Sequence, residues 1–349
     1  MDPIRTAVLG ASGFAGGELV RLLAQHPAFE VTYLGGGASS GRSLADVQPH
    51  LAASALASAP LGPLEAGLIA SASALVFSAL PNGRSADLAP DLVEAGCTVV
   101  DLAGDFRLPA DDYPAWYGFE HPAPAWTDKA VYGLPELFAE RLPGARLVAN
   151  PGCFATPAIL GCAPLLDAGL VEADAIAVDG KTGISGAGRA VTEATSFAAT
   201  DGSIRPYRVP SHQHTPEIER GIELASGAAP RVLFAPHLVP TVRGVVTTCY
   251  LRLREGASTE DLTEALRASY AGRAFVRVLP AGGMVDAKRT TGTNLVELQA
   301  VADPRSGTAV VIGAIDNLIK GAAGQAIQAA NLVNGLDEAT ALPATAGYP

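Results

Sequence analysis

The sequence is poor in charged and in aromatic side chains. Only 17% of its 349 residues are charged and 6% are aromatic, whereas 48% are hydrophobic. The 24 basic residues are outnumbered by 35 acidic ones, for a formal net charge of -11, and no run of basic residues occurs. Nucleic-acid binding requires a basic surface, so no nucleic-acid partner is expected.

Cysteines and long apolar runs are also scarce. The four cysteines lie far apart and show neither C-x-x-C nor disulfide-scaffold spacing: Cys97, Cys153, Cys162 and Cys249. The longest apolar stretch, residues 67–81, is too short and too rich in Ser and Ala to cross a bilayer. The chain opens with a strand pattern, which leaves no room for a signal peptide. We therefore expect a soluble cytoplasmic protein with no membrane partner.

The length and the pattern of the first half predict two domains of the α/β class. A single hydrophobic core rarely grows beyond about 250–300 residues. Over residues 1–148, apolar strand patterns alternate with helical ones, which predicts a Rossmann-type, doubly wound parallel sheet. The expected strands are Ile4–Leu9, Phe29–Leu34, Ala74–Leu80 and Thr98–Leu102. Segment 109–135, rich in Pro, Tyr and Trp, has no clean periodicity, so we expect it to pack irregularly at the surface.

A glycine triplet follows the first predicted strand and precedes an apolar helical stripe. Gly10, Gly13 and Gly16 form G-x-x-G-x-x-G, a spacing variant of the dinucleotide-binding fingerprint. Glycines let the backbone approach a pyrophosphate, and the helix N-terminus offers N–H groups to it. We expect a dinucleotide to contact these glycines, joined by Ser12, Phe14, Pro81 and Asn82.

The end of the second predicted strand favours NADP(H) over NAD(H). An NAD-specific protein usually places Asp or Glu there to hold the ribose 2′-hydroxyl. This chain has no acid at that point and offers Ser39, Ser40 and Arg42, which suit a 2′-phosphate. The alternative is a solvated glycine-rich loop in which Arg42 has no role.

Cys153 is the candidate nucleophile. It follows the strand pattern Ala145–Ala149 through a Pro-Gly turn, and the apolar helical pattern Ala158–Leu166 comes next. The dipole and the unpaired N–H groups of a helix N-terminus favour thiolate over thiol. Most free cysteines are small core residues, and this stretch alone leaves that alternative open.

Two histidines lie at a second predicted helix start. His212 and His214 precede Thr215, the expected N-cap, and Pro216, the expected first helical residue. Histidine is the usual proton carrier near neutral pH, and we expect His214, beside the helix start, to be the acid–base group, with His212 as the alternative. Paired histidines also bind zinc, but no further ligands occur at metal-site spacing, so no metal is expected.

The second half of the chain shows a different order of predicted elements. Strand patterns follow one another with few helices between them, which indicates an antiparallel or mixed sheet in an α+β catalytic and oligomerisation domain over residues 149–314. The strand patterns are Ala175–Asp179, Arg231–Ala235, Val245–Leu253, Phe275–Leu279, Asn294–Ala302 and Thr308–Ile312. A small-residue helix from Ala314 to about Val333 is expected to return with residues 315–349 to the first domain and to place Asn317 near the nicotinamide.

Several hydroxyl and guanidinium groups are candidates for binding a small anionic substrate. The glycine-rich loop 180–189 can wrap backbone amides and one guanidinium around an anion. Arg107 lies in a loop where an ion pair with Asp105 is an equal alternative. The substrate candidates are Ser185, Arg189, Arg243 and Arg107, and Gly186 is expected to contact the cofactor.

Taken together, the motifs resemble the N-acetyl-γ-glutamyl-phosphate reductase family. The matching segments occur in that family's order and span nearly the whole chain: Gly10–Gly16, Asn150–Cys153, Ser185–Arg189, His212–Glu217, Pro236–Gly244 and Ala314–Gln325. The resemblance implies an enzyme of arginine biosynthesis, with a fold similar to aspartate-semialdehyde dehydrogenase and glyceraldehyde-3-phosphate dehydrogenase. We expect a homo-oligomer, either a dimer or a tetramer.

The resemblance implies reduction of an acyl phosphate by NADPH through a covalent intermediate. Cys153 attacks the acyl carbon and phosphate leaves, the resulting thioester is reduced, and His214 supplies a proton. His212, Arg243 and the loop from Ser185 to Arg189 hold the carboxylate and phosphate.

The chain also departs from the family pattern. Asn82 stands where the family often has His, and Gln213 stands where it often has Arg. The residues after Cys153 resemble a related reductase that acts on an aminoadipyl phosphate in lysine biosynthesis, which is the alternative function. A non-catalytic NADP-binding redox sensor would lose the thiol and imidazoles that this chain retains.

Overall fold

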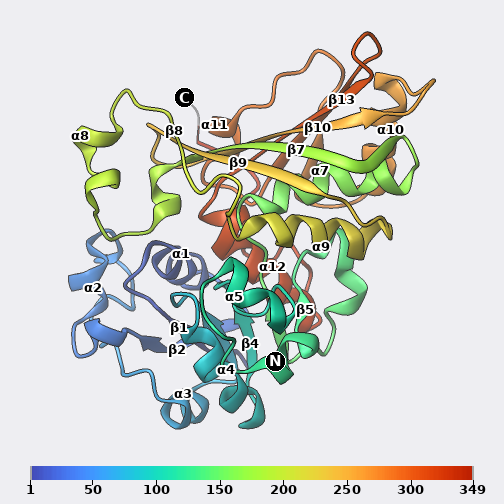
Figure 1. The fold of residues 1–349 in the computed structure, drawn as a ribbon. Helices are drawn as coiled ribbons and strands as arrows, with labels where there is room; N and C mark the ends of the chain where they lie inside the picture. The colour runs from blue at the N-terminus through green and yellow to red at the C-terminus, as the bar shows by residue number, and fades with distance from the viewer. Residues whose placement is uncertain (1, 348–349) are drawn as a thin grey trace. The chain divides into compact units, whose positions relative to one another are not determined.

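The computed structural model describes residues 2–347 and shows two compact units (Figure 1). The first unit runs to Pro151 and resumes over Ala322–Leu342. The second comprises Gly152–Gly321 and the residues from Pro343 onward. Each unit is built on a sheet of its own.

The sheet of the first unit is entirely parallel, as the alternating pattern predicts. Its six strands lie in the order β2-β1-β3-β4-β6-β5, and every neighbouring pair is parallel. The strands are β1 (Ile4–Leu9), β2 (Phe29–Gly35), β3 (Leu75–Ser78), β4 (Thr98–Asp101), β5 (Val131–Tyr132) and β6 (Leu147–Ala149). The central strands are buried because helices cover both faces of a sheet of this kind.

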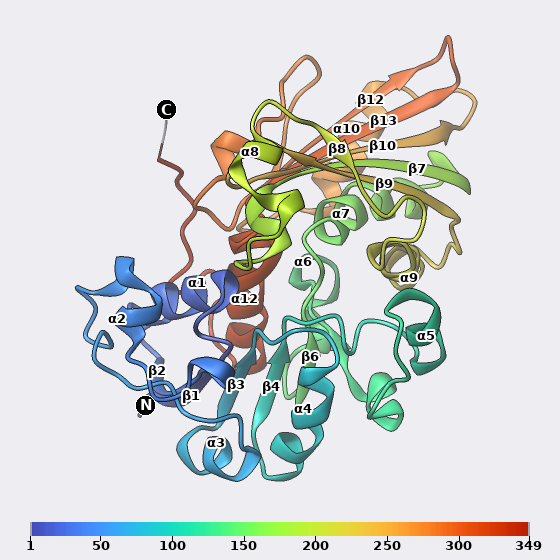
Figure 2. The ribbon, with the colours of Figure 1, turned by 60° about the vertical axis from the view of Figure 1, so that its left-hand side comes forward.

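Helices cover this sheet in two groups (Figure 2). On one side, α1 (Phe14–Leu23) contacts α12 (Gly324–Val333), and on the other α3 (Ala66–Ala72) contacts α4 (Arg84–Glu94). Three helices of a single turn complete the unit: α2 (Leu44–Val47), α5 (Tyr113–Trp116) and α6 (Pro135–Phe138).

The expectation of irregular surface packing for residues 109–135 is wrong in part. The segment contains α5 and β5, and Tyr113 is fully buried. The Tyr113 hydroxyl donates to the Gly104 carbonyl at 2.8 Å, and its ring stacks on Tyr117. These elements are too short to carry a helical or strand period, so the aromatic side chains, and not a repeating pattern, anchor the segment.

The sheet of the second unit is mixed, as predicted. Its order is β11-β12-β13-β10-β7-β9-β8, with β7 parallel to β9, β11 parallel to β12 and the other neighbours antiparallel. The strands are β7 (Val171–Gly183), β8 (Arg205–Pro206), β9 (Val232–Val239), β10 (Val245–Leu253), β11 (Val276–Val278), β12 (Val296–Asp303) and β13 (Thr308–Ile315). Strand β9 thus continues past the end of the predicted strand Arg231–Ala235 and includes His237.

Three long helices pack on one face of this sheet. They are α7 (Ala155–Asp167), α9 (His214–Ser226) and α10 (Thr259–Ser269). Two short helices, α8 (Phe197–Thr200) and α11 (Ala287–Thr290), lie in connections. None of the helices within residues 2–347 has the length and hydrophobicity needed to span a membrane.

The predicted helix from Ala314 begins later than expected. Strand β13 continues to Ile315, a π-helix follows over Ile319–Ala323, and α12 begins only at Gly324. The reason is Asp316, whose buried carboxylate accepts the backbone N–H groups of Leu318 and Ile319. This side-chain turn ends the strand and sets the direction of the residues that follow.

Candidate active site

Cys153 lies in the turn immediately before α7. The Gly152 carbonyl accepts the Thr156 N–H at 3.0 Å, so the turn runs directly into the helix. No acidic residue occupies the first turn of α7. The side chain of Cys153 is partly exposed, whereas Cys97, Cys162 and Cys249 are buried. Cys153 therefore has the helix-mouth position and the access that a nucleophile needs.

A buried carboxylate from α9 holds the turn that carries Cys153. The Gly152 N–H donates to Glu217 Oε1 at 2.7 Å, and Glu217 is fully buried. Glu217 Oε2 lies 3.9 Å from His214 Nε2. A Cβ atom at position 152 would overlap the His214 ring, so the glycine is what allows this imidazole to lie against the turn. The structure thus brings Cys153 and His214 together within the second unit.

Helix α9 begins two residues earlier than predicted. Its first residue is His214 and its N-cap is Gln213, whereas Pro216 was the expected first residue and Thr215 the expected N-cap. His212 replaces the expected threonine cap, because its Nδ1 accepts the His214 N–H at 3.0 Å. Nδ1 of His212 must therefore be unprotonated, which leaves Nε2–H as its donor.

Aromatic rings surround both histidines. Phe154 lies about edge-on to each imidazole, with centroids 6.1 Å from His212 and 6.0 Å from His214. Phe234 and Tyr207 approach His212 at 5.2 and 5.5 Å. Burial, followed by the charges of His214 and Arg208, lowers the pKa of His212 to about 2. His212 is consequently neutral near pH 7 and suited to donate a hydrogen bond, not to exchange a proton.

Gly321 packs directly on the nucleophile. A Cβ atom at Gly321 would lie 2.6 Å from Cys153 Cβ, which is closer than real Cβ atoms approach. The Gly321 N–H donates to the Asp316 carbonyl at 2.9 Å. The π-helix that contains Gly321 therefore fixes one wall beside Cys153, in keeping with the frequent occurrence of π-turns at functional sites.

A second cluster joins three predicted residues. Asn317 Nδ2 donates to Ser185 Oγ at 2.9 Å, and Asn317 Oδ1 accepts the Gly244 N–H at 2.9 Å. Gly186 lies beside them, since a Cβ there would be 3.8 Å from Asn317 Nδ2. The neighbouring Arg243 contacts Asp316 Oδ2 at 3.5 Å. Arg189 lies at the exposed end of the same loop.

Arg107 belongs to the first unit and is nearly buried. Its Nε donates to the Asn150 carbonyl at 2.7 Å and its Nη2 donates to the Leu102 carbonyl at 2.9 Å. Asp105 accepts two backbone N–H groups at the start of α4, from Gly83 and Ala86. These bonds give both side chains a structural role in the loops after β3 and β4.

The glycine triplet forms a close-packed turn between β1 and α1. Gly10 has a φ of 78°, and a Cβ atom there would overlap the Ala79 carbonyl. A Cβ atom at Gly16 would overlap Gly10. Gly13 is the N-cap of α1 without a side-chain capping bond, and no acid lies in the first helical turn. These residues fit a dinucleotide, because the open helix N-terminus favours a pyrophosphate and the glycines leave it space. Ser12 and Phe14 lie in this turn and at the helix start.

The residues after β2 include no acidic side chain. Gly35 ends the strand, and Gly36 and Gly37 follow it. Ser39 ends a short 3-10 turn, and Ser40 Oγ donates to the Leu61 carbonyl. Arg42 is exposed, and its Nη2 donates to the Asp46 carbonyl at 2.9 Å.

Pro81 and Asn82 lie between β3 and α4. Asn82 Oδ1 accepts the Gly104 N–H at 3.0 Å, which ties this loop to the one after β4. No cluster of three or more metal-ligating side chains is found among residues 2–347.

Sequence reasoning missed the positional roles of Glu217, Gly321 and Asp316. Glu217 follows His214 at the i+3 spacing that brings side chains together, which is a signal that the sequence does carry. Gly321 and Asp316 were not named as candidates, because no sequence pattern shows that Gly321 packs on Cys153 or that Asp316 contacts Arg243.

Two families match the chain. Residues 5–145 match the family described as "Semialdehyde dehydrogenase, NAD binding domain", and residues 153–317 match "Semialdehyde dehydrogenase, dimerisation domain". The first match covers the glycine turn, and the second covers Cys153, His214 and the cluster of Ser185 and Asn317.

Full-length relatives share one name. A protein from Magnetococcus marinus is 41% identical over 99% of each chain, and one from Symbiobacterium thermophilum is 46% identical over 97% of each. Both are named N-acetyl-gamma-glutamyl-phosphate reductase.

Solved structures share the fold. Aspartate semialdehyde dehydrogenase II from Vibrio cholerae, in complex with ASA, superimposes with a TM-score of 0.72 at 17% identity, covering 96% of this chain and 99% of its own. The enzyme from Candida albicans with NADP gives a TM-score of 0.70 at 19% identity, covering 95% and 99%.

Proposed function

Because the chain belongs to the N-acetyl-γ-glutamyl-phosphate reductase family, we propose that it reduces N-acetyl-L-glutamyl 5-phosphate to the 5-semialdehyde, with release of phosphate, in arginine biosynthesis. The observation that carries this proposal is the full-length identity of 41–46% to relatives of that name. The thiol of Cys153, in the turn against which the His214 imidazole lies, supplies the chemistry that the reaction requires.

The first step forms a thioester. His214 accepts the Cys153 proton, the thiolate attacks the acyl carbon, and the carbon–oxygen bond to phosphate breaks as phosphate leaves. The buried Glu217 carboxylate stabilises the positive charge that His214 gains. The position of Cys153 at the start of α7 favours the thiolate.

The second step returns the proton. NADPH, when bound, supplies the hydride that reduces the thioester carbon. His214 gives its proton to the oxygen that becomes negative, and the same histidine removes it as the aldehyde forms and the Cys153 thiolate is released. His212, held neutral, donates a hydrogen bond from Nε2 to the substrate and keeps His214 in place through its backbone bond.

Charged residues of both units bind the anionic groups of the substrate and the cofactor. Arg243, fixed by Asp316, and the loop from Ser185 to Arg189 hold carboxylate or phosphate oxygens. Arg107 is assigned to the same task, although its backbone bonds also give it a structural one. The cofactor contacts are Gly10, Ser12, Gly13, Phe14, Gly16, Ser39, Ser40, Arg42, Pro81, Asn82, Gly186 and Asn317.

The cofactor is NADP(H). Support comes from the absence of an acid after β2 together with the exposed Arg42 guanidinium, since Asp or Glu at this point would repel a 2′-phosphate. The close-packed turn at Gly10 and Gly16 is the feature that fits the pyrophosphate.

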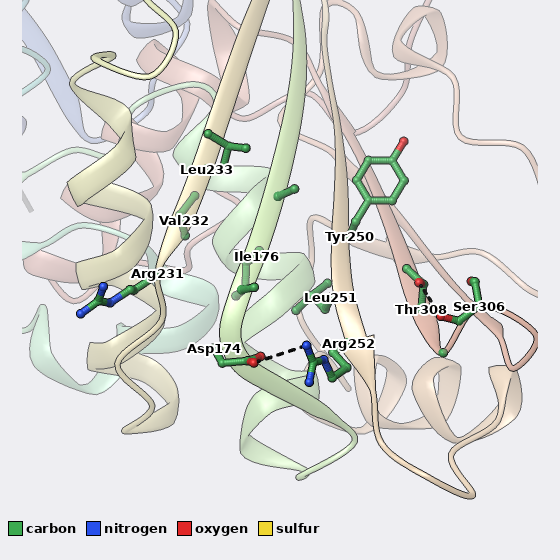
Figure 3. Close-up of a pocket in the computed structure, with 13 residues that line it drawn as sticks. Asp174, Ile176, Arg231, Val232, Leu233, Tyr250, Leu251, Arg252, Ser306 and Thr308 are labelled. Atoms are coloured by element: carbon green, nitrogen blue, oxygen red, sulfur yellow. Dashed lines mark hydrogen bonds and ion pairs between the residues drawn. The ribbon is translucent and has the colours of Figure 1, made fainter.

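The second unit also supports a homodimer. Leu233, Ala177, Tyr250, Val310 and Val301 lie side by side in one row across five strands. Leu233 is 56% exposed and Tyr250 is 41% exposed, and both lie along a groove on the face opposite α7 and α9 (Figure 3). A second copy of the chain would cover this apolar row.

The dimer proposal is tested by Leu233→Asp. Light scattering during gel filtration should give a dimer for the wild type and a monomer for the variant. A monomeric wild type, or a variant that remains a dimer, would contradict this interface.

A cytoplasmic location completes the proposal. None of the four cysteines forms a disulfide, and Cys162 and Cys249 are buried in the core of the second unit. Free thiols are the rule in reducing compartments.

The activity is tested most simply in the oxidative direction. Purified protein should oxidise N-acetylglutamate semialdehyde only when NADP+ and phosphate are both present. An aldehyde derived from aminoadipate is the matched alternative substrate. Faster turnover of that aldehyde would assign the lysine pathway, and turnover of neither would contradict the proposed function.

A further inference from the structure

Tyr207 lies at the edge of the aromatic group around the histidines. It follows β8, and its N–H donates to the Pro236 carbonyl of β9 at 3.1 Å. Its ring meets His212 edge-on, with centroids 5.5 Å apart and planes at 72°. The ring is thus held by a backbone bond on one side and by an imidazole on the other.

The hydroxyl of Tyr207 differs from those of three other tyrosines in its hydrogen bonding. Tyr33, Tyr113 and Tyr270 each donate to a backbone carbonyl, of Pro63, Gly104 and Leu160 respectively. Within residues 2–347, the Tyr207 hydroxyl has no hydrogen-bond partner, although the residue is only partly exposed. A phenol in such surroundings usually finds a partner, so this one is available to a ligand.

Ring contacts lead from Tyr207 to the turn that carries Cys153: the centroids of His212 and His214 lie 4.7 Å apart, and a Cβ atom at Gly152 would overlap the His214 ring. Burial first, and then the negative charge of the Cys153 thiolate, raise the pKa of Tyr207 well above its usual range, while Arg208 opposes the shift. Tyr207 therefore keeps its proton throughout the working pH range. It can donate a hydrogen bond near Cys153, and it cannot act there as a base.

We propose that the Tyr207 hydroxyl donates a hydrogen bond to the acyl oxygen of the substrate while Cys153 attacks the acyl carbon. The carbon–sulfur bond forms, the carbonyl π electrons move to oxygen, and the phenol stabilises that oxygen without giving up its proton. As the carbonyl re-forms, the bond to phosphate breaks and phosphate leaves. Donors aimed at such an oxygen are commonly the largest single contribution to acyl transfer. The proposal rests on the proposed function, because it needs an acyl substrate at Cys153.

The test is Tyr207→Phe, which keeps the ring against His212 and removes only the hydroxyl. The rate of phosphate release from N-acetylglutamyl phosphate should fall by roughly 10²-fold, the scale of a lost oxyanion donor, with KM changed by less than about twofold. Alkylation of Cys153 by iodoacetamide creates no oxyanion, so its rate should stay within about twofold of the wild-type rate.

Tyr270→Phe is the matched control. It removes a buried hydroxyl that bonds to Leu160 on α7, so it should lower the melting temperature while both rates stay unchanged. Wild-type phosphate release by Tyr207→Phe would overturn the proposal. So would a parallel fall in the alkylation rate, because Tyr207 would then act through the thiol or the fold. A wild-type protein without reductase activity would instead contradict the proposed function.

Discussion

The two units hold their candidate functional groups in different ways. In the first unit the candidate groups belong to the backbone. The turn at Gly10 and Gly16 packs so closely that neither position has room for a Cβ atom, and the N-terminus of α1 has no side-chain cap. In the second unit the candidate groups are side chains, with Cys153 before α7 and with His214 and Glu217 on α9. A backbone site is robust to many substitutions but not to an added Cβ, whereas a side-chain site fails when one functional group is removed.

The two units also differ in how far apart in sequence the residues of each candidate site lie. The glycines of the first unit lie within seven residues of sequence, from Gly10 to Gly16. The contact between Gly152 and Glu217 joins residues 65 positions apart. The second site therefore exists only when the sheet of its unit has placed α7 next to α9, which are in contact.

The largest expected effect is in the second unit. Cys153→Ser should lower turnover by a factor on the order of 10⁶, the scale reported for loss of a nucleophile, because an alcohol is not ionised near pH 7. Binding of NADPH, which we propose involves backbone groups of the first unit, should stay unchanged in a fluorescence titration. Activity close to wild type would exclude covalent catalysis by Cys153.

Loss of the acid–base group comes next. His214→Asn should reduce turnover by about 10²–10⁴-fold with little change in KM. His212→Asn should mainly raise KM if, as we propose, the buried neutral ring binds substrate and exchanges no proton. Steady-state kinetics of both variants checks the assignment. Reversed phenotypes would exchange the two roles.

Neutralising Glu217 should have a smaller effect. Glu217→Gln keeps an acceptor for the Gly152 N–H but removes the charge beside His214, which predicts a fall in turnover of about 10–100-fold. The pH profile of kcat should move to lower pH, because the imidazolium loses its partner. Glu219→Gln, on the same helix, is the control and should leave the profile in place. An unshifted profile for Glu217→Gln would mean that Glu217 serves only the fold.

In the first unit, the exception to backbone binding is Arg42. Arg42→Ala should weaken the binding of NADPH by roughly 1–3 kcal/mol and leave the binding of NADH unchanged, because only NADPH carries the 2′-phosphate. Arg21→Ala, which removes a guanidinium paired with Glu18 on α1, is the control. An equal loss of affinity for both cofactors would show that Arg42 does not bind the 2′-phosphate.

The smallest effect concerns pH, and its sign should differ between the units. Burial, and then Asp105, raise the pKa of Asp101 to about 7 from 3.8, so its stabilising effect is full below pH 3.8 and is lost as the pH rises toward 7. The pKa of His212 is lowered to about 2 from 6.5, so its effect is full above pH 6.5 and is lost as the pH falls toward 2.

These signs are measured as melting temperatures between about pH 4.5 and 8. Asp101→Asn should reduce the loss of stability on going from pH 5 to 8. His212→Asn should reduce the loss on going from pH 7 to 4.5. Identical slopes for both variants and the wild type would contradict the two pKa directions.

Local sequence patterns were sufficient to predict several strands in both units. The parallel sheet and the glycine turn of the first unit follow from local patterns, and the predicted strand Ile4–Leu9 agrees with β1. The strand Val245–Leu253 agrees with β10 in the same way. Alternation and strand length are local properties, so the sequence suffices for them.

The remaining features depend on the contacts of individual side chains and not on a repeating pattern. Asp316 ends β13 through its own side chain and delays the helix, and Tyr113 buries a segment that has no period. The carboxylate of Glu217 reaches the turn of Cys153 only through the packing of two helices. Cys153 and His214 could be named from sequence, whereas what positions them could not.

The central claim is a covalent acyl intermediate on Cys153, and a phosphate burst tests it directly. N-acetylglutamyl phosphate is mixed with the protein without NADPH, phosphate is followed in time, and the quenched protein is mapped by mass spectrometry. The account predicts about one phosphate per chain in the burst and an N-acetylglutamyl group on the Cys153 peptide, both lost in Cys153→Ser. An active wild-type protein that shows no burst, or that carries the acyl group on another residue, would contradict it.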